Sequence, residues 1–370
     1  MMIPFVSPTS GGALRPIGDA LLGTGERFPI VAGIPRFVST GAYVESFGLQ
    51  WNIHTQTQLD SYTHAGLSTQ RLARCLGFAP ARLAGLTVLE VGCGAGRFTE
   101  VLVQAGAFVH AVDLSNAVDA NRRNIGERPN YVVAQADLLR PPFPAGSFDV
   151  VLCLGVLQHT PSPKASVAAL WRMVKAGGLL VIDHYTWSLS RVTKLAPLYR
   201  AVLKRIPPAA AKRVTNALVD WFFPIHWRAR KVTVAQRLLS RVSPCLAYCH
   251  IYPQMSRELH EDWCRLDTFD ELTDHYKHLR TTGQIRRLLE GLGGLDVTAG
   301  GEGQRRRGSL PQTLRELEVL KNPQILTRGA ASAIVCGHVR DLRDLRRLRP
   351  TAGRPHGQAH GGFHATPRAG

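Results

Sequence analysis

The stretch Thr87–Thr99, TVLEVGCGAGRFT, decides the fold. Its first five residues are mostly apolar or β-branched, a composition typical of a strand that is buried on both faces. The glycine-rich turn Gly92–Gly96 follows, and after it Phe98, Val101 and Leu102 recur at helical spacing. A strand, a glycine turn and a helix in this order direct free backbone N–H groups and a helix N-terminus toward a ligand. The stretch therefore predicts a ligand-binding turn in an α/β domain.

Apolar strands alternate with helical segments from residue 85 to residue 185. After the first strand and its helix, we expect strands at AFVHAVDLS (107–115), NYVVAQADLL (130–139), FDVVLCL (148–154) and LLVIDHY (179–185). Regular alternation of this kind is typical of parallel strands joined by crossover helices. The sequence therefore predicts an α/β fold with a doubly wound parallel sheet.

Changes in composition divide the chain into six segments. The expected divisions are an N-terminal extension with a short hairpin (1–50), a helical lead-in or lid (51–84), the core (85–185), a basic helical insertion (186–265), a returning part of the core (266–305) and a basic tail (306–370). Beyond residue 340 the tail is rich in Arg, Gly, Pro and His without apolar periodicity, which predicts disorder. Within the tail, the apolar run ASAIVCGHV (331–339) predicts one further strand.

The distribution of charge indicates what the chain binds. Of the net charge of +18 on 370 residues, +11 lies in residues 186–243 and +9 in residues 303–370. The remainder is close to neutral, so a catalytic core with cationic attachments fits better than a nucleic-acid-binding protein. Seven dispersed cysteines without CxxC pairs indicate reduced thiols. Together with an N-terminus that does not resemble a signal peptide, this predicts a cytoplasmic protein.

The basic insertion contains a cationic amphipathic helix. Its apolar residues recur at spacings of three and four, with Arg and Lys between them: Val192, Leu195, Leu198, Val202 and Ile206. We favour a helical cap whose apolar faces pack on the sheet and whose basic face is solvated. The alternatives are peripheral contact of residues 186–243 with a membrane surface and reception of an anionic substrate.

The glycine turn and the acidic residues near it narrow the choice of ligand. A dinucleotide fingerprint, G-x-G-x-x-G, needs a glycine at position 97, where this chain has Arg97. This argues against a nicotinamide-dependent oxidoreductase, which stays as one alternative. Glu90 lies in the first strand. Asp113 ends the second strand, where it can accept hydrogen bonds from a ribose, and Asp137 ends the third, where it can accept from an adenine amino group.

These residues and their order resemble the class I S-adenosylmethionine-dependent methyltransferases. VLEVGCGAGRFT (88–99) is similar to the first motif of that family, VDLS (112–115) to the second, and QADLLRPPFPAGSFDVVLCLGVLQHTPSP (135–163) to the third and fourth. The resemblance covers residues 85–185 and, less closely, 266–300. It implies a Rossmann-like seven-stranded sheet in the order 3-2-1-4-5-7-6 and S-adenosylmethionine as the cofactor.

The resemblance also implies which residues contact the cofactor: Glu90, Gly92, Cys93, Gly94, Gly96, Asp113, Leu114, Asp137, Leu138 and Leu154. The turn residues are expected to approach the methionine and ribose, and Glu90 to orient the turn or the methionine amino group. Asp113 is expected to hold the ribose, and Asp137 and Leu138 to contact adenine. Leu154 is expected under the methionine end.

The family reaction is an in-line displacement at a sulfonium methyl group, for which the protein aligns the reactants and excludes water. An oxygen or nitrogen acceptor also benefits from a general base. His159 and His184 lie at the carboxyl ends of the fourth and fifth strands and are the catalytic candidates. We predict methyl transfer to a small-molecule, glycan or lipid-type acceptor, at oxygen or nitrogen rather than carbon. A cofactor-binding protein without catalysis is the alternative from another class.

Two further features concern metals and access to the turn. Cys245, Cys249 and Cys264 lie near His250 and His260, but their spacing matches no zinc-ligand pattern, and we predict no metal. In the lead-in, Trp51 either covers the glycine turn as a lid or packs in the core.

Overall fold

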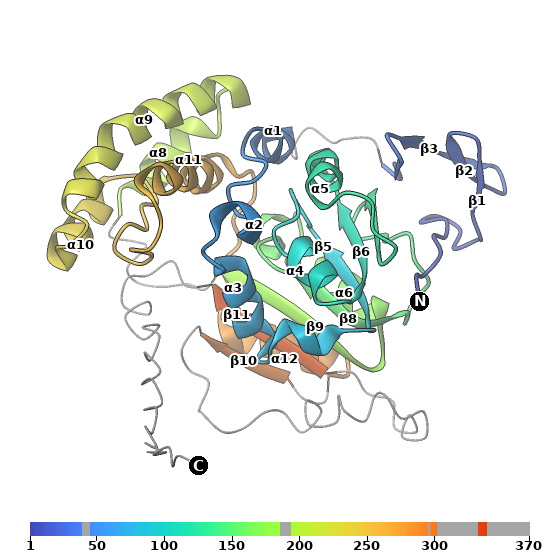
Figure 1. The fold of residues 1–370 in the computed structure, drawn as a ribbon. Coiled ribbons are helices and arrows are strands. Elements are labelled where there is room, and N and C mark those ends of the chain that lie inside the picture. Colours follow the sequence, from blue (N-terminus) through green and yellow to red (C-terminus); the bar gives the residue numbers. More distant parts are fainter. Residues whose placement is uncertain (39–44, 186–193, 295–296, 302–331, 339–370) are drawn as a thin grey trace, which may run out of the picture.

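The computed structural model describes residues 1–38, 45–185, 194–294, 297–301 and 332–338, and is built around a seven-stranded sheet (Figure 1). The strands are β5 (Thr87–Val91), β6 (Phe108–Asp113), β7 (Tyr131–Gln135), β8 (Phe148–Cys153), β9 (Val174–Tyr185), β10 (Val297–Gly301) and β11 (Ser332–His338). Across the sheet they run β10-β11-β9-β8-β5-β6-β7, and all neighbours are parallel. Numbered along the chain, this is the predicted order 3-2-1-4-5-7-6.

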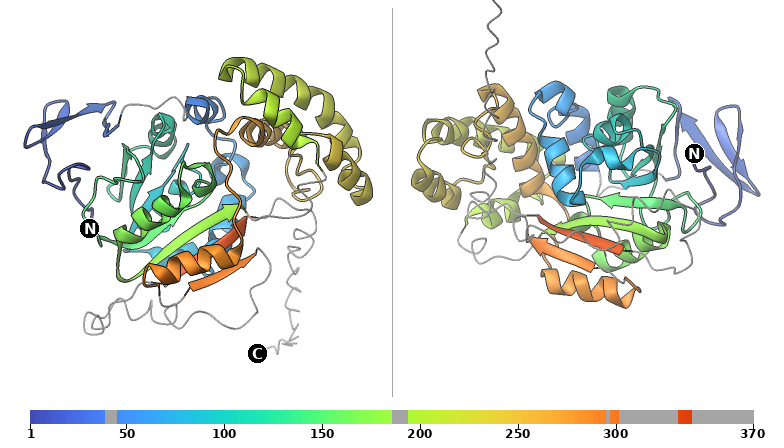
Figure 2. Two further views of the ribbon diagram at one scale, coloured as in Figure 1. Left: turned by 180° about the vertical axis from the view of Figure 1, so that it is seen from behind. Right: turned by 60° about the horizontal axis from the view of Figure 1, so that its bottom comes forward.

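Strand β5 is buried on both faces, as its composition predicts. Val88 packs into the apolar cluster on one face of the sheet, and Leu89 and Val91 pack into the cluster on the other. Helices α3, α4 and α5 contribute to the first cluster, and α6 and α12 to the second. Figure 2 shows helices on both sides of the sheet. Their bounds are α3 (Leu67–Leu76), α4 (Thr99–Gln104), α5 (Ala117–Ile125), α6 (Pro163–Met173) and α12 (Thr282–Gly291). The doubly wound arrangement is therefore confirmed.

The last strand of the sheet comes from the segment expected to be a tail. Residues 332–338 form β11, which lies between β9 and β10 and pairs Ile334 with Val181. The apolar run at 331–339 predicted this strand, but the core reaches past the expected division at residue 305. The rest of the tail, with all residues beyond 340, lies outside the described residues.

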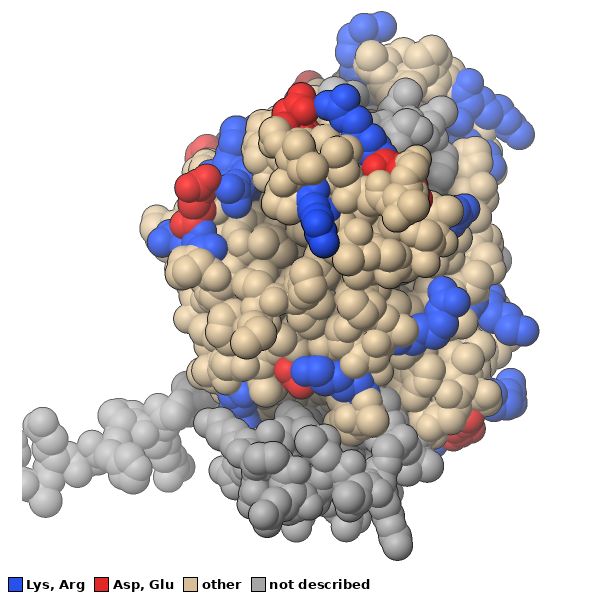
Figure 3. All heavy atoms as spheres, turned by 90° about the vertical axis from the view of Figure 1, so that its right-hand side faces the viewer, with Lys and Arg blue, Asp and Glu red and all other residues tan. Residues whose placement is uncertain are grey.

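The N-terminal extension forms a small sheet of its own, larger than the predicted hairpin. It has four antiparallel strands, β1 (Arg15–Ile17), β2 (Ala20–Gly23), β3 (Glu26–Val31) and β4 (Ile34–Pro35). Aromatic rings attach this segment to the core: Phe5 stacks on Phe143 with ring centroids 5.2 Å apart and contacts Phe37. On this side of the molecule, Lys and Arg are scattered among acidic and uncharged residues (Figure 3).

The insertion is helical, as predicted, but its apolar residues are not placed as predicted. It contains α8 (Ala196–Leu203), α9 (Pro208–Arg228) and α10 (Thr233–Val242). Helix α11 (Arg257–Thr273) continues past the expected division at residue 265, and the four helices are grouped at one side of the sheet (Figure 1). Leu195, Leu198 and Val202 are exposed, so the expectation that the apolar face around α8 packs on the sheet is wrong. Val192 lies outside the described residues.

The lead-in connects the small sheet to the core. It holds α1 (Glu45–Ile53), α2 (Asp60–Thr63), α3 and a short 3-10 helix, Pro80–Leu83. In the described part of the chain, every helix is too short or too polar to cross a bilayer.

Candidate functional site

A cavity of about 200 Å³ lies at the carboxyl ends of β5, β6, β8 and β9. This is the edge of a doubly wound sheet at which ligands bind. Predicted site residues that line the cavity are Gly92, Cys93, Gly94, Asp113, Leu114, Leu138, Leu154 and His159. Trp51 of α1 and Asp267 and Asp270 of α11 complete the walls. The glycine turn, the lead-in and the insertion therefore meet at one site.

The glycine turn has no room for side chains at the positions that face the cavity. Gly92 and Gly94 have positive φ angles of 75° and 49°, which glycine adopts without strain. A Cβ added to Gly92 would lie 2.1 Å from Cγ2 of Val156, and one added to Gly94 would lie 3.3 Å from Cε2 of Trp51. Gly96, with φ of 105°, does not line the cavity, so its part is to shape the turn.

Trp51 lies against Gly94 and lines the cavity. This position favours a lid over the glycine turn rather than packing in the core. The helix that carries Trp51 is attached to the insertion through His54 at its C-terminal end. His54 Nδ1 lies 2.8 Å from Oδ1 of Asp262 on α11, and its Nε2 lies 2.8 Å from Nζ of Lys212 on α9. Burial lowers the pKa of Lys212 to about 8. The lid and the insertion are therefore joined by buried polar contacts.

Asp113 lines the cavity at the end of β6, as predicted. Its Oδ2 accepts a hydrogen bond from the backbone N–H of Gly94 at 3.0 Å. Its Oδ1 accepts from the N–H and the hydroxyl of Ser115, at 2.8 and 2.7 Å. Burial raises the pKa of this carboxyl group, although these hydrogen bonds oppose the shift. Asp113 thus fixes the turn while it faces the cavity.

Glu90 does not line the cavity but lies directly before Val91 and Gly92, which do. It ends a buried chain of hydrogen bonds in which each donor is oriented by the next residue. Tyr131 OH donates to Asn121 Oδ1 at 2.6 Å, Asn121 Nδ2 donates to Thr99 Oγ1 at 3.0 Å, and Thr99 Oγ1 donates to Glu90 Oε2 at 2.6 Å. Burial raises the pKa of Glu90 to about 8. The carboxyl group joins β5 to α4 and α5 beneath the turn, consistent with the expected orienting part.

Asp137 and His184 also lie away from the cavity. The Asp137 carboxylate accepts from the N–H of Leu139 at 2.9 Å, and its neighbour Leu138 lines the cavity instead. His184 is buried in β9, with Nδ1 2.9 Å from the carbonyl oxygen of Tyr185, and burial lowers its pKa. Alternation along the strand turns Tyr185 into the cavity and His184 away from it. His184 therefore does not line the cavity, and His159 is the candidate that does.

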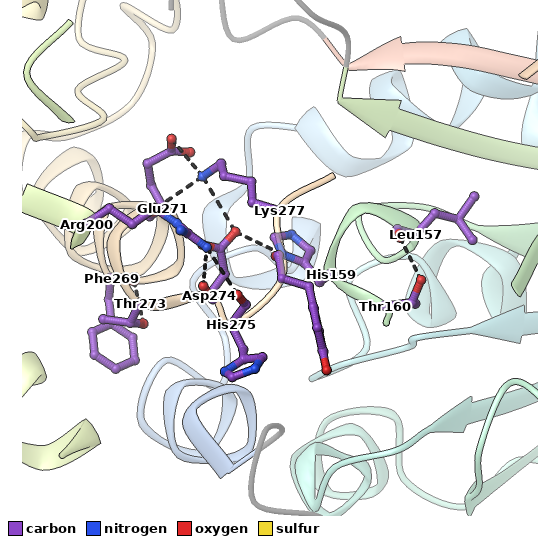
Figure 4. Close-up of polar contacts among 11 residues, drawn as sticks. Leu157, His159, Thr160, Arg200, Phe269, Glu271, Thr273, Asp274, His275 and Lys277 are labelled. Atoms are coloured by element: carbon purple, nitrogen blue, oxygen red, sulfur yellow. Dashed lines mark hydrogen bonds and ion pairs between the residues drawn. The ribbon is translucent and has the colours of Figure 1, made fainter. Parts of the chain in front are cut away.

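His159 lines the cavity and is backed by a buried carboxylate (Figure 4). Its Nδ1 lies 3.1 Å from Oδ2 of Asp274 and 3.3 Å from the carbonyl oxygen of Tyr276. Arg200 of α8 donates to the other carboxylate oxygen at 2.7 Å, and Lys277 lies 3.5 Å from Oδ2. Burial alone would raise the pKa of Asp274, but His159, Lys277 and Arg200 together lower it.

Asp274 was not among the predicted residues. It follows α11 and lies more than a hundred positions after His159, and nothing in its local sequence marks it. Two acceptors at Nδ1 favour the neutral tautomer with its proton on that nitrogen, so Nε2 is the basic atom of the ring. This is the arrangement in which a carboxylate orients a histidine base.

Arg97 is a second functional candidate that sequence reasoning missed. Its side chain lines the cavity, and burial lowers its pKa to about 10. Nε donates to Oγ of Ser68 and Nη1 to Oε1 of Gln58, both at 3.1 Å, and the guanidinium lies 5.4 Å from the ring centroid of Trp263. Within the described residues no carboxylate lies in ion-pair contact with it. The hydrogen-bond partners of Arg97 are neutral, and the carboxylates of Asp267 and Asp60 act on it at longer range. A buried cation of this kind beside a cavity is suited to an anionic group of a ligand.

No group of three or more His, Cys, Asp or Glu side chains is arranged to hold a metal ion within the ranges that the structure describes.

Residues 89–182 match a family described as a methyltransferase domain. They run from the first strand of the sheet through the glycine turn, Asp113 and His159 to β9. The chain carries a class I S-adenosylmethionine-dependent methyltransferase domain. The lid, the insertion and the returning strands lie outside this methyltransferase domain in sequence but contribute to its cavity and sheet.

Curated relatives of the methyltransferase domain include two ubiquinone biosynthesis O-methyltransferases. The protein from Pseudomonas paraeruginosa (strain DSM 24068 / PA7) is 41% identical over 107 residues, which are 28% of this chain and 46% of the relative. The one from Thiobacillus denitrificans (strain ATCC 25259 / T1) is 41% identical over 102 residues, 26% of this chain and 44% of the relative. The chain thus spans less than half the length of these relatives.

Among solved structures, magnesium protoporphyrin IX methyltransferase (ChlM) from Synechocystis PCC 6803 with bound SAH is 24% identical and has a TM-score of 0.31. That match covers 40% of this chain and 72% of the other. The sugar N-methyltransferase KedS8 from Streptoalloteichus sp. is 27% identical, with a TM-score of 0.27, and the match covers 33% of this chain and 48% of the other.

Proposed function

We propose that this protein transfers the methyl group of S-adenosylmethionine to a hydroxyl group of a small-molecule acceptor. The observation that carries the proposal is His159 in the cavity wall with Asp274 behind it, because a hydroxyl group needs a base to become a good nucleophile. The O-methyltransferase names of the curated relatives support oxygen as the acceptor atom.

The cavity fits S-adenosylmethionine. Gly92 and Gly94 have no side chains between their backbone and the cavity, so the N–H groups of the turn are open to close approach by a ligand. Asp113 is the acceptor for ribose hydroxyls at the end of β6, and Leu138 is an apolar neighbour for adenine at the end of β7. Arg97 supplies a buried cation for a carboxylate such as that of the methionine portion.

Methyl transfer also needs a base, a group that orients the base and the exclusion of water, and residues of this chain supply all three. When bound, S-adenosylmethionine supplies an electrophilic methyl group and a neutral thioether as the leaving group. His159 Nε2 accepts the proton of the acceptor hydroxyl as its oxygen becomes the nucleophile. Asp274 holds the imidazole by Nδ1 and stabilises the imidazolium that forms. Trp51 covers the glycine turn and excludes water from the site.

The test uses the full chain with methyl-labelled S-adenosylmethionine and an extract of the source cells. We expect label to enter a low-molecular-weight product that is stable to mild base, as an ether is. We expect His159→Ala to lower the rate about 10²–10⁴-fold, the usual contribution of a general base. His184→Asn is the matched control, because His184 is a buried histidine outside the cavity.

Binding of S-adenosylmethionine without labelled product in any fraction would favour the binding protein without catalysis. Calorimetric titration with NADH in place of S-adenosylmethionine distinguishes the oxidoreductase alternative, for which NADH would be the tighter ligand. Equal rates of methyl transfer for His159→Ala and the native chain would show that His159 is not a general base.

A further inference from the structure

The exposed apolar side chains of this protein gather in the helical insertion. Within the described residues, large apolar side chains that are well exposed lie mostly between positions 195 and 242. Trp221 on α9 is 70% exposed, Leu238 on α10 is 67% exposed and Leu198 on α8 is 66% exposed. Single exposed apolar residues need no explanation, but such a concentration on neighbouring helices marks an interaction surface.

On each helix the exposed apolar residues lie on one side. Spacings of three, four and seven place residues on the same face of a helix. On α8 and at its start these residues are Leu195, Leu198 and Val202; on α9 they are Val214, Trp221 and Ile225. On α10 they are Val234, Leu238 and Val242. Each stripe has the regular spacing of an amphipathic helix that packs its apolar side against a core, but here the stripe is exposed.

Helix α10 buries its polar side and exposes its apolar side, which is the opposite of a helix in a globular core. Its one fully buried residue is Gln236, which is polar. Gln236 Nε2 donates to the carbonyl oxygen of His226 at 2.6 Å, and its Oε1 lies 2.9 Å from Nδ1 of the same histidine. His226 Nε2 lies 3.0 Å from Oγ of Ser243. The polar side of α10 is thus fixed inward by hydrogen bonds, which leaves Val234, Leu238 and Val242 directed outward.

Cationic side chains lie among the stripes. Lys204, Arg213, Arg228, Lys231 and Arg237 are exposed, and no carboxylate of the described residues lies in ion-pair contact with any of them. The single acid of residues 186–243, Asp220, is held by Arg265 of α11 at 2.5 Å. Helices α8, α9 and α10 therefore each carry an exposed apolar stripe in a segment with unneutralised positive charge, the composition of helices that lie in the interface of an anionic membrane.

We infer that the insertion docks this protein on the surface of an anionic lipid bilayer through α8, α9 and α10. Charge complementarity selects this partner: anionic headgroups match the cations, and acyl chains match the stripes. A second copy of the chain would bring a surface of the same sign, which repels. The contact is peripheral, because none of these helices is long and apolar enough to span a bilayer. The inference does not rest on the methyl transfer proposed above.

The experiment is sedimentation of the full chain with vesicles of phosphatidylcholine, alone or mixed with phosphatidylglycerol. We expect pelleting with the anionic vesicles and little with the neutral ones. The variant V234S/L238S/V242S is expected to bind the anionic vesicles at least about tenfold less, because membrane binding scales with buried apolar area. The matched control is I17S/V31S, which removes exposed apolar side chains of the N-terminal sheet.

Charge and fold are controlled separately. K231E/R237E keeps the apolar stripes and is expected to lose most of its preference for anionic vesicles. Circular dichroism and thermal melting identify any variant that fails to fold. In that case the test is the tryptophan fluorescence of the native chain with and without vesicles. The part of the signal that W221F lacks belongs to Trp221. A blue shift that requires anionic vesicles supports docking. No anionic preference, equal binding by both serine variants, or a dimer in solution that V234S/L238S/V242S dissolves would overturn it.

Discussion

His159 Nδ1 lies 3.1 Å from Oδ2 of Asp274, and Arg200 of the insertion holds the opposite oxygen of the same carboxylate at 2.7 Å. The carboxylate is fully buried, and among the described residues the charged groups that stabilise it are these neighbours and Lys277. Removing one member of a buried, hydrogen-bonded charge cluster leaves the others unpaired in a medium of low polarity. The orientation of His159 and the docking of α8 are therefore linked through one residue.

Asp274→Asn is expected to destabilise the protein by about 3–5 kcal/mol near neutral pH. Because the neighbouring cations lower the pKa of Asp274, its charge stabilises the fold above the pKa of the unfolded chain. That contribution is lost as the pH falls through the lower pKa of the folded protein. The difference in free energy of unfolding between the native chain and the variant should therefore shrink in acid. Urea unfolding at pH 7 and at a pH well below 3.8, the ordinary pKa value for this carboxyl group, measures it.

Lys277→Met is the milder companion variant, because Lys277 also pairs with Glu271 and contacts Asp274 at the longer distance of 3.5 Å. We expect it to cost less stability than Asp274→Asn at pH 7. The opposite order would show that Asp274 is held mainly by Lys277 and not by Arg200 and His159.

Glu90→Gln is expected to change the pH dependence of stability. Burial raises the pKa of Glu90 from 4.5 to about 8, so the folded protein keeps this proton where the unfolded chain has lost it. The native chain should therefore lose stability relative to the variant as the pH rises from 4.5 to about 8, by roughly 1.4 kcal/mol per unit of pH. Urea unfolding of both proteins across this range provides the measurement, and parallel curves would contradict a protonated Glu90.

Asp113→Ala is expected to weaken S-adenosylmethionine binding by about 1–3 kcal/mol, the cost of losing charge-assisted hydrogen bonds. The structure adds that the variant also frees the N–H of Gly94, so the turn itself becomes less fixed. Calorimetric titration gives the affinity. Asp137→Ala serves as the control, because its carboxylate lies outside the cavity; similar losses in both variants would show that the ribose assignment is wrong.

Gly94→Val is expected to abolish S-adenosylmethionine binding. The new side chain would meet the indole of Trp51 and occupy a backbone conformation, φ of 49°, that valine rarely adopts. Gly283→Ala is the control for a glycine change, since a Cβ there meets nothing within 4 Å. Thermal melting with and without ligand separates lost binding from lost fold. A ligand-dependent rise in the melting temperature of Gly94→Val would show that the glycine turn is not part of the binding site.

Much of the core could be predicted because it depends on short-range patterns. The apolar strands, the glycine turn and the acidic residue after β6 each carry their signal within a few residues. The run at 331–339 predicted β11, but its position between β9 and β10 places a strand of the expected tail inside the core. The strand order followed from the family resemblance and not from the pattern alone.

The site outside the turn could not be predicted in the same way. His159 and His184 are equivalent by position in sequence, since each is expected at the carboxyl end of a strand. Only the pleat of β9 and the loop after β8 decide that one lines the cavity and the other is buried. Asp274 and Arg200 carry no local signal, because their partners are distant in the chain and meet through the packing of α8 and α11.

By itself the sequence determined the α/β alternation, the glycine turn and the concentration of positive charge in the insertion, because composition and spacing along the chain define them. The tertiary structure decided which carboxylate supports His159, that Arg97 is buried beside the cavity, and which way the insertion helices face. The physical reason is that an amphipathic pattern gives the width of an apolar stripe but not its direction. On α10 that direction is set by the buried hydrogen bonds of Gln236 with His226.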